Sequence, residues 1–130
     1  MADNQLVVTN NDLVMINENN GLGNILKPLI REIHLFDTFV AGTSFLKDKS
    51  VLDEIKIEDK LILQRENNKF DSNAILLLTE GKKLGYIPEK DNIIFARLLD
   101  AGKVITAKVK GIQQKGTFKQ ISIGIYLVDL

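Results

Sequence analysis

Two phenylalanines, Phe45 and Phe70, have the residue type of a site that stacks on the bases of a single nucleic-acid strand. Phe45 follows the short segment 40–42, and Phe70 follows the polar run 65–69 and precedes Asp71. An exposed aromatic ring stacks on a base with about 1 to 3 kcal/mol. Both rings lie in or beside predicted turns, although packing into the core is the more common outcome for phenylalanine. We take the two rings as the first candidates for binding.

Lysines are the second group with a possible role in binding. Between Lys82 and Lys119 the sequence has three acidic residues and nine basic ones, which are Lys82, Lys83, Lys90, Arg97, Lys103, Lys108, Lys110, Lys115 and Lys119. Strand alternation puts Lys108 and Lys110 on the outward side of a strand, where they form a stripe that follows backbone phosphates. Solubilising lysines on a polar face are an equally good interpretation for each one.

The sequence contains few residues that could catalyse a reaction or bind a metal ion. The chain has no Cys, and its single His, His34, lies in a predicted strand, so disulfides, Cys-zinc sites and thiol nucleophiles are excluded. The acidic residues between positions 53 and 59 alternate with lysines, which is typical of a solvated surface. The Gly21-Leu22-Gly23 segment lacks the third Gly and the Gly-Lys-Ser/Thr ending of phosphate loops. We therefore expect no catalytic residues, no metal site, zinc included, and no cofactor.

Composition predicts one globular domain. The chain has 130 residues, 45% hydrophobic and 26% charged, with a formal net charge of zero. Residues 1–5 lack the basic segment of a signal peptide, and the longest apolar run, near 74–78, is far too short to span a bilayer. We expect a cytoplasmic protein with no membrane partner.

The pattern of elements predicts an N-terminal extension, residues 1–30, followed by a domain over residues 31–130. The Asn-rich extension offers short strands or helices at 6–8 and 13–16 and a helical face at 22–30 interrupted by Pro28. In the domain, predicted strands cover 33–40, 61–63, 74–79, 84–87, 104–112 and 118–128.

Two helices complete the predicted domain. Ser50 is expected to cap a short helix at 51–55, and the main helix is expected from about Asp91 to Ala101, packed through Ile94, Phe95, Leu98 and Leu99. Five or six strands with one main helix close most economically as a small OB-like β-barrel, because an open sheet of this size leaves its edges exposed. The predicted fold class is therefore mainly β.

Three segments together resemble the HIRAN domain family over about residues 33–129. They are Phe39-Val40-Ala41-Gly42-Thr43-Ser44-Phe45, Phe70-Asp71-x-Asn73-Ala74-Ile75 and Leu84-Gly85-Tyr86-Ile87-Pro88. The resemblance implies an OB-like barrel that binds the 3′-hydroxyl end of single-stranded DNA and acts without catalysis as an accessory to DNA repair or processing. It implies a helicase or nuclease as the partner protein.

The resemblance also implies roles for individual residues. Phe45 and Phe70 would sandwich the terminal base while Asp71 accepts the hydroxyl proton. Three further residues fall near other contact positions of the family, namely Tyr86, Lys90 and Phe118.

The chain departs from the family's pattern in its binding segments. Ser44 and Leu46 stand where DNA-binding relatives carry an Arg and a second Tyr, and the loop 66–71 is one residue shorter and has no Pro. The alternative function is therefore a protein-interaction or scaffold domain that retains the barrel without binding DNA ends. Exposure of Phe45 and Phe70 beside each other is the feature that favours DNA binding over the alternative.

Overall fold

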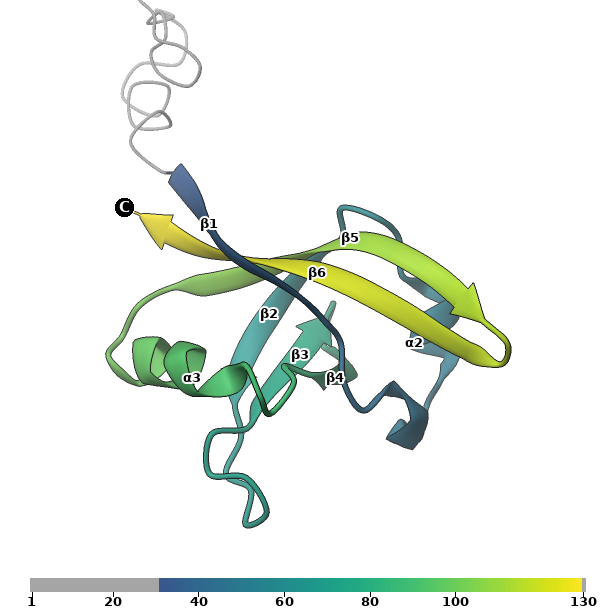
Figure 1. Ribbon diagram of the computed structural model, residues 1–130, viewed down its shortest axis with the longest axis horizontal. Helices are drawn as coiled ribbons and strands as arrows, with labels where there is room; N and C mark the ends of the chain where they lie inside the picture. The colour runs from purple at the N-terminus through teal and green to yellow at the C-terminus, as the bar shows by residue number, and fades with distance from the viewer. Residues whose placement is uncertain (1–30, 130) are drawn as a thin grey trace, which may run out of the picture. The chain divides into compact units, whose positions relative to one another are not determined.

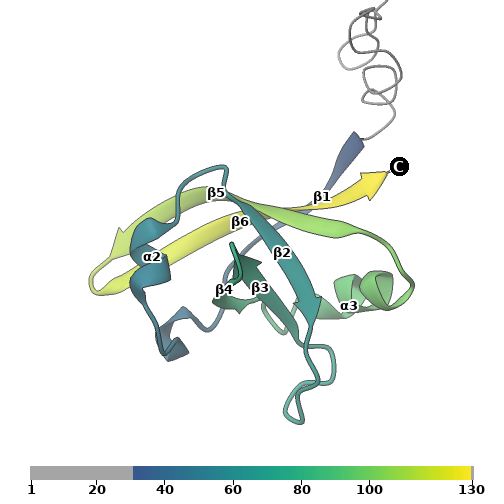
Figure 2. The ribbon, with the colours of Figure 1, turned by 180° about the vertical axis from the view of Figure 1, so that it is seen from behind.

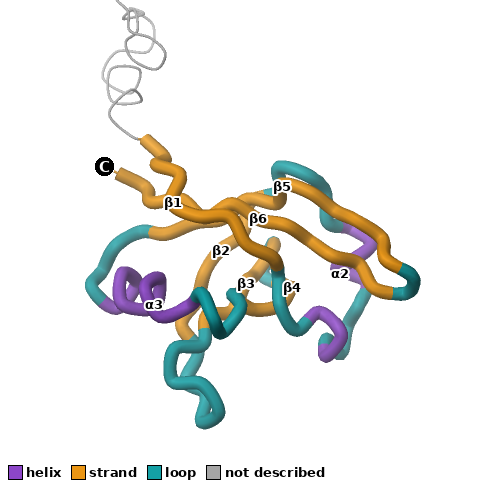
Figure 3. Tube along the Cα trace, in the orientation of Figure 1, coloured by secondary structure: helices purple, strands orange, loops and turns teal. Residues whose placement is uncertain are grey.

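The computed structural model describes residues 31–129, which contain one six-stranded sheet, two α-helices and a 3-10 turn (Figures 1 and 3). The strands are β1 (Arg31–Phe39), β2 (Lys60–Arg65), β3 (Ile75–Thr79), β4 (Lys82–Tyr86), β5 (Ile105–Lys115) and β6 (Phe118–Asp129). The helical elements are η2 (Thr43–Phe45), α2 (Ser50–Glu54) and α3 (Asn92–Asp100). The predicted mainly β class, with one main helix and one short helix, is confirmed.

Residues 34–127 form one compact unit, while residues 31–33 and 128–129 belong to a second. In the second unit the Arg31 guanidinium donates to the Asp129 carboxylate at 3.3 Å. The short elements predicted at 6–8, 13–16 and 22–30, and the Gly21-Leu22-Gly23 segment, lie outside the described residues. The boundary predicted at residue 30 stays a prediction.

The strands follow the order β1-β6-β5-β2-β3-β4, and a single bridge after β1 spans the gap between the two edges. Ala41 N–H donates to the Tyr86 carbonyl at 2.8 Å, and Tyr86 N–H donates to the Ala41 carbonyl at 2.9 Å. A Cβ at Gly85 would lie 2.5 Å from the Ala41 carbonyl oxygen, so the bridge requires glycine there. One detail of the predicted barrel is therefore corrected. The six-stranded sheet is open, because its edge strands β1 and β4 do not pair and only the isolated Ala41–Tyr86 bridge connects the two edges.

The core lies on the inner face of the strands and follows their alternation. Ile105, Ala107 and Val109 of β5 are buried, and so are the alternating isoleucines Ile121, Ile123 and Ile125 of β6. The strands β2, β3 and β4 add Leu61, Leu63, Ile75, Leu77 and Leu84. Each large apolar side chain buried in this way contributes about 1.5 to 3 kcal/mol relative to leaving it in water.

The strands predicted at 74–79 and 84–87 are confirmed and pair as the β3–β4 hairpin. Glu80 and Gly81 form its two-residue turn with φ of 49° and 81°. Two consecutive residues with positive φ match the right-handed twist of the flanking strands, and glycine adopts that conformation without steric cost. The turn therefore fixes the register in which Thr79 lies opposite Lys82, and an irregularity between Leu77 and Leu78 then shifts the pairing so that Leu77 lies opposite Gly85.

Two details of the predicted helices are wrong. Ile94 is 62% exposed, because α3 packs through the narrower stripe of Asn92, Phe95 and Ala96. The predicted packing of Leu98 and Leu99 is confirmed, since both are partly buried against the core. Ser50 is the first residue of α2, not its cap, and its N–H and hydroxyl donate to Asp48 Oδ1 at 3.0 and 2.6 Å.

The helices and one loop are placed at different ends of the sheet. In both ribbon views α2 lies near the turn of the long β5–β6 hairpin, whereas α3 lies near the other end of β5 (Figures 1 and 2). Lys119 Nζ of β6 donates to the Leu52 carbonyl of α2 at 2.8 Å. The loop between β2 and β3 projects away from the strands in every view (Figure 3). None of the described helices is long and apolar enough to cross a membrane.

Candidate functional site

Two loops carry the exposed aromatic rings. We call residues 42–48 the Phe45 turn and residues 66–74 the Phe70 loop. The side chains of Phe45 and Phe70 are 88% and 84% exposed, the highest values among the large hydrophobic residues that the structure describes, whereas Phe95 is 5% exposed. A ring left in water adds nothing to the core and has its face open to a stacking partner. Both rings are therefore available to a ligand.

Arg65 ties the two ends of the Phe70 loop together. Its guanidinium donates to the carbonyls of Ala74 at 2.9 Å and Ser72 at 3.0 Å. The same group donates through Nε to Asp100 of α3 at 2.9 Å, and this hydrogen bond holds the pKa of Asp100 below its ordinary value. A fixed base restricts the conformations of the loop, which lowers the entropy cost of binding a ligand.

Asn68 organises the interior of the same loop. Its side-chain oxygen accepts the Phe70 N–H at 2.8 Å, and its side-chain nitrogen donates to Glu66 Oε1 at 3.2 Å. Its backbone carbonyl accepts the Asp71 N–H at 3.3 Å. Asn side chains commonly hydrogen-bond the backbone two residues further on, and this turn signal is present in the sequence. Asn68 was nevertheless not among the predicted site residues.

Asp71 is oriented by two hydrogen bonds that still leave it acceptor capacity. Oδ1 accepts the Asn73 N–H at 2.9 Å, and Oδ2 accepts from the side-chain amide of Asn92 at 2.8 Å. Asn92 is the buried first residue of α3, so the carboxylate is anchored to the core. An ionised carboxylate has about four lone-pair sites, and a ligand hydroxyl can therefore still donate to Asp71.

Tyr86 connects the Phe70 loop with the Phe45 turn. Its hydroxyl donates to the Glu66 carboxylate, whose oxygens lie 2.8 and 3.0 Å away. On the other side, a Cβ at Gly42 would lie 3.5 Å from Tyr86 Cδ1, so the turn packs directly on the ring. Burial raises the pKa of Tyr86, and the hydrogen bond to Glu66 raises it further. Tyr86 therefore stays a protonated donor at neutral pH and joins the two loops.

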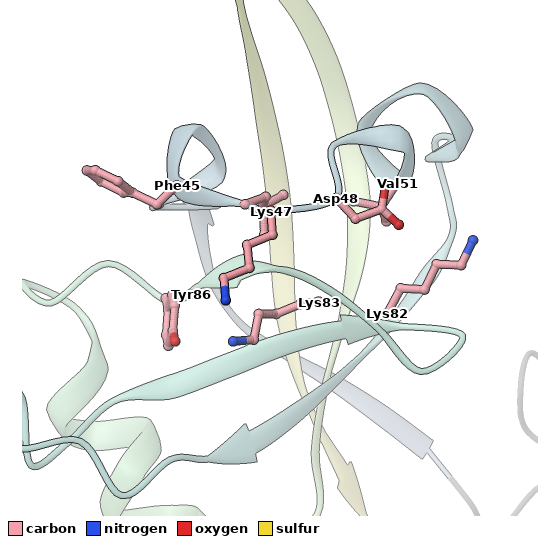
Figure 4. A pocket seen from close by; sticks show the side chains of 9 residues that line it. Phe45, Lys47, Asp48, Val51, Lys82, Lys83 and Tyr86 are labelled. Carbon is pink, nitrogen blue, oxygen red and sulfur yellow. The ribbon is translucent and has the colours of Figure 1, made fainter.

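A pocket of about 480 Å³ opens between the Phe45 turn, the start of α2 and β4 (Figure 4). Small-molecule sites commonly have volumes of about 300 to 1,000 Å³. The lining residues are Gly42, Phe45, Leu46, Lys47, Asp48, Val51, Lys82, Lys83 and Tyr86. Lys83 is predicted only as a member of the basic stretch 82–119 and Lys47 is not predicted at all, because only the fold brings the Phe45 turn beside β4.

The other predicted DNA-binding residues lie apart from this pocket. Lys90 Nζ donates to the Asp91 carboxylate at 2.9 Å, and the Thr38 hydroxyl donates to the same oxygen at 2.7 Å. Burial acts to raise the pKa of Asp91, but the two hydrogen bonds outweigh it and the pKa is lowered. Phe118, which begins β6 beside the hairpin turn, is 43% exposed.

Lys108 and Lys110 lie on the outward face of β5. Their Nζ atoms lie 5.0 and 5.6 Å from the centre of the Tyr126 ring, within the range of cation–π attraction. Lys110 Nζ also pairs with the Glu58 carboxylate at 3.1 Å. The structure thus brings Phe45 and Tyr86 to one pocket and links Phe70 and Asp71 to them, while Lys108 and Lys110 belong to another surface.

Within residues 31–129, no group of three or more His, Asp or Glu side chains is arranged to hold a metal ion. The imidazole of His34 lies 2.7 Å from the Asp37 carboxylate and stacks edge-on against Tyr126. The exposed contacts of His34 are those of a surface residue.

Comparisons with known proteins give one family and two similar solved structures. A family model described as HIRAN domain matches residues 33–128. A protein from Lactobacillus plantarum is 26% identical with a TM-score of 0.70, and the match covers 78% of this chain and 99% of that one. The HIRAN domain of human HLTF is 17% identical with a TM-score of 0.61, covering 79% of this chain and 82% of that one. The likeness to the second structure confirms the predicted OB-like fold. A comparison with curated protein sequences found no match to this chain.

Proposed function

The chain belongs to the HIRAN domain family, and from this premise we propose that it binds the 3′-hydroxyl end of single-stranded DNA. Family membership supports nucleic-acid binding in general and assigns the chain to a family of binding domains. The 3′ end, the preference for a single strand and a role in DNA repair or processing are our proposal. A helicase or nuclease partner in the cytoplasm would supply the catalytic step.

The observation that carries this proposal is the exposure of Phe45 and Phe70 on two loops joined through Tyr86. The Phe45 turn packs on the Tyr86 ring, and the Phe70 loop is bonded to its hydroxyl through Glu66. In this proposal the terminal base enters between the Phe45 turn and the Phe70 loop and stacks on their exposed rings. Such stacking does not depend on which base is present, because every base has an aromatic face. The site therefore binds strands of any sequence.

Asp71 gives the site its preference for a hydroxyl end. Its carboxylate is oriented by Asn73 and Asn92 and has lone pairs left for a 3′-hydroxyl proton. A terminal 3′-phosphate is a dianion at neutral pH, and the negative carboxylate repels it. Discrimination between the two ends thus rests on one residue.

The test is fluorescence anisotropy of the full chain with short thymidine oligonucleotides labelled at the 5′ end. Two strands that differ only in a 3′-hydroxyl or a 3′-phosphate are compared, and the hydroxyl strand is expected to bind more tightly. Asp71→Asn removes the negative charge and should erase most of this difference while retaining binding. Equal binding of both ends by the wild-type chain would contradict the proposal and favour the scaffold alternative.

A further inference from the structure

The pocket beside Phe45 holds three lysines and a single aspartate, and their partners differ. Lys82 Nζ pairs with the Glu54 carboxylate at 3.0 Å. Asp48 Oδ1 accepts two hydrogen bonds from Ser50, which lower the pKa of Asp48. Within the described chain, the side-chain amino group of neither Lys47 nor Lys83 has a hydrogen-bond acceptor or a carboxylate within ion-pair distance. Two cations of the same pocket are therefore uncompensated.

The two uncompensated lysines come from different walls of the pocket. In Figure 4 Lys47 extends from the Phe45 turn and Lys83 from β4, and both amino groups point toward the part of the pocket that holds Tyr86. Asp48 and Lys82 lie at the other end, near Val51. Like charges that converge repel each other, and an anion between them replaces this repulsion with two attractions. The Tyr86 end of the pocket thus has the electrostatics of an anion site.

We propose that Lys47 and Lys83 bind the last phosphodiester of the strand, the one on the 5′ side of the terminal nucleotide. This inference rests on the proposed function, because Asp71 defines where the strand ends. Tyr86 joins the Asp71 side of the site, through Glu66, to the pocket that holds both lysines. A strand whose hydroxyl lies at Asp71 and which continues past Tyr86 meets these lysines with its first backbone phosphate.

The chemistry of the pocket matches a nucleotide linkage better than a free anion. Lysine is a flexible point charge with three donors, suited to the non-bridging oxygens of a phosphodiester. Phe45, Leu46 and Val51 supply apolar lining that suits the sugar and base attached to the phosphate. The pocket volume of about 480 Å³ also leaves room for more than a phosphate group.

The experiment is a double-mutant cycle between the protein and the DNA backbone. A neutral methylphosphonate replaces either the last linkage or one near the 5′ end of the labelled thymidine strand. For the wild-type chain, the last-linkage substitution should weaken binding about tenfold, which is the scale of one charged hydrogen-bonded contact. The combined variant Lys47→Gln and Lys83→Gln should bind the natural strand about tenfold more weakly and lose little more with methylphosphonate at the last linkage.

Matched controls separate this site from general charge effects. Lys82→Gln removes a lysine of the same pocket that Glu54 already pairs, and should change affinity less than about twofold. Methylphosphonate near the 5′ end should weaken the wild type and the double variant equally. If the double variant still loses about tenfold with the last-linkage substitution, or if the wild type is indifferent to it, the proposal is wrong.

The same strands distinguish failure of this inference from failure of end recognition. The double variant should still prefer a 3′-hydroxyl over a 3′-phosphate, because Asp71 is unchanged. Coupling between the lysines and the last phosphate without any end preference would leave the lysine site standing and overturn the role of Asp71. A preference for the 3′-hydroxyl end without coupling between the lysines and the last phosphate would support the role of Asp71 and overturn the lysine site. A wild-type chain that binds no strand would overturn both proposals.

Discussion

Two surfaces of the molecule carry lysines and aromatic rings, and they differ in how far the protein itself satisfies them. On the outward face of β5, Lys108 and Lys110 lie over the Tyr126 ring, and Lys110 pairs with Glu58. Hydrogen bonding with Tyr126 and then with Glu58 raises the pKa of Lys110. On the loop side, which comprises the Phe45 turn, the Phe70 loop and Tyr86, the two phenylalanine rings are exposed and two pocket lysines are uncompensated.

The difference teaches that the density of basic residues along a sequence does not locate a binding surface. The stretch from Lys82 to Lys119 is the most basic part of the chain, yet several of its lysines pair with acidic residues or lie over a ring of the same fold. A cation that already has an intramolecular partner must give it up to bind a phosphate, which reduces the net gain. We expect the loop side to dominate binding.

The largest expected effect comes from adding one methyl group at matched glycines of the two surfaces. Gly85→Ala puts Cβ 2.5 Å from the Ala41 backbone oxygen and from Val40 Cγ1, so the bridge that holds the Phe45 turn must shift. We expect a loss of about 3 kcal/mol in the free energy of unfolding, the upper end of typical overpacking costs. Chemical denaturation with circular dichroism measures this loss.

Gly124→Ala is the matched change on the β5–β6 face. Its Cβ would lie 3.0 to 3.3 Å from Oη, Cε1 and Cζ of Tyr126, so the outer end of this side chain must move by a few tenths of an ångström while no backbone atom is crowded. The expected loss is below about 1 kcal/mol. Equal losses at both glycines would show that the Ala41–Tyr86 bridge is not the constrained element that we infer.

The second effect concerns the exposed rings themselves. Phe70→Ala and Phe45→Ala should each weaken binding of single-stranded DNA by about 1 to 3 kcal/mol through lost stacking. Stability should hardly change, because the two side chains are 84% and 88% exposed. Ile94→Ala, which removes a 62% exposed apolar side chain from α3, is the control. If all three variants bind like the wild type in anisotropy titrations, the rings are not the stacking surface.

The third effect is expected on the face of β5 and is smaller. Lys110→Gln removes a cation already paired with Glu58, so affinity should fall less than about twofold. The slope of log affinity against log salt should change by much less than about 0.7, the value for one phosphate contact with a single strand. A drop in affinity as large as that of the Lys47 and Lys83 double variant would show that the phosphates of the strand bind along β5 and not in the pocket.

The smallest effect is a pH dependence that originates at Tyr86. Its pKa is raised in the folded chain by burial and by the Glu66 hydrogen bond. The folded state therefore favours the protonated phenol, and this contribution is present below the ordinary tyrosine pKa of about 10 and is lost as the pH rises toward the raised value. In urea unfolding between neutral pH and pH above 10, the wild type should lose stability more steeply than Tyr86→Phe.

Lysines titrate in the same pH range in the wild type and in Tyr86→Phe. Only the difference between their two slopes of unfolding free energy against pH is therefore informative. Identical slopes would mean that the phenol of Tyr86 is not held in its protonated form by the fold. The result would then remove the proposed link between the Phe45 turn and the Phe70 loop.

Much of the fold was predictable because it follows from local patterns. Alternation along 105–109 and 121–125 correctly identifies the buried face of the β5–β6 hairpin, since successive side chains of a strand point to opposite faces. The Glu80-Gly81 turn is equally local. The exposure of Ile94 was not predictable, because several apolar stripes run along α3 and only the docked sheet selects one of them.

The candidate site was predictable only in part. The family resemblance singled out Phe45, Phe70 and Asp71, and the fold leaves both rings exposed. It gave no sign of Asn92, which reaches Asp71 from a different element. Lys47 was missed and Lys83 was noted only as part of a basic stretch, because the two lie far apart in sequence and share a pocket only when the Ala41–Tyr86 bridge brings the turn beside β4.

The most direct test of the central claim is an NMR titration of the 15N-labelled chain with a short thymidine strand that ends in a 3′-hydroxyl. We predict that the backbone amide signals of Phe45, Phe70, Asp71 and Tyr86 shift in proportion to bound strand, while those of Lys108, Lys110 and Tyr126 stay in place. Shifts concentrated at Lys108, Lys110 and Tyr126, with the loop side unchanged, would contradict the account.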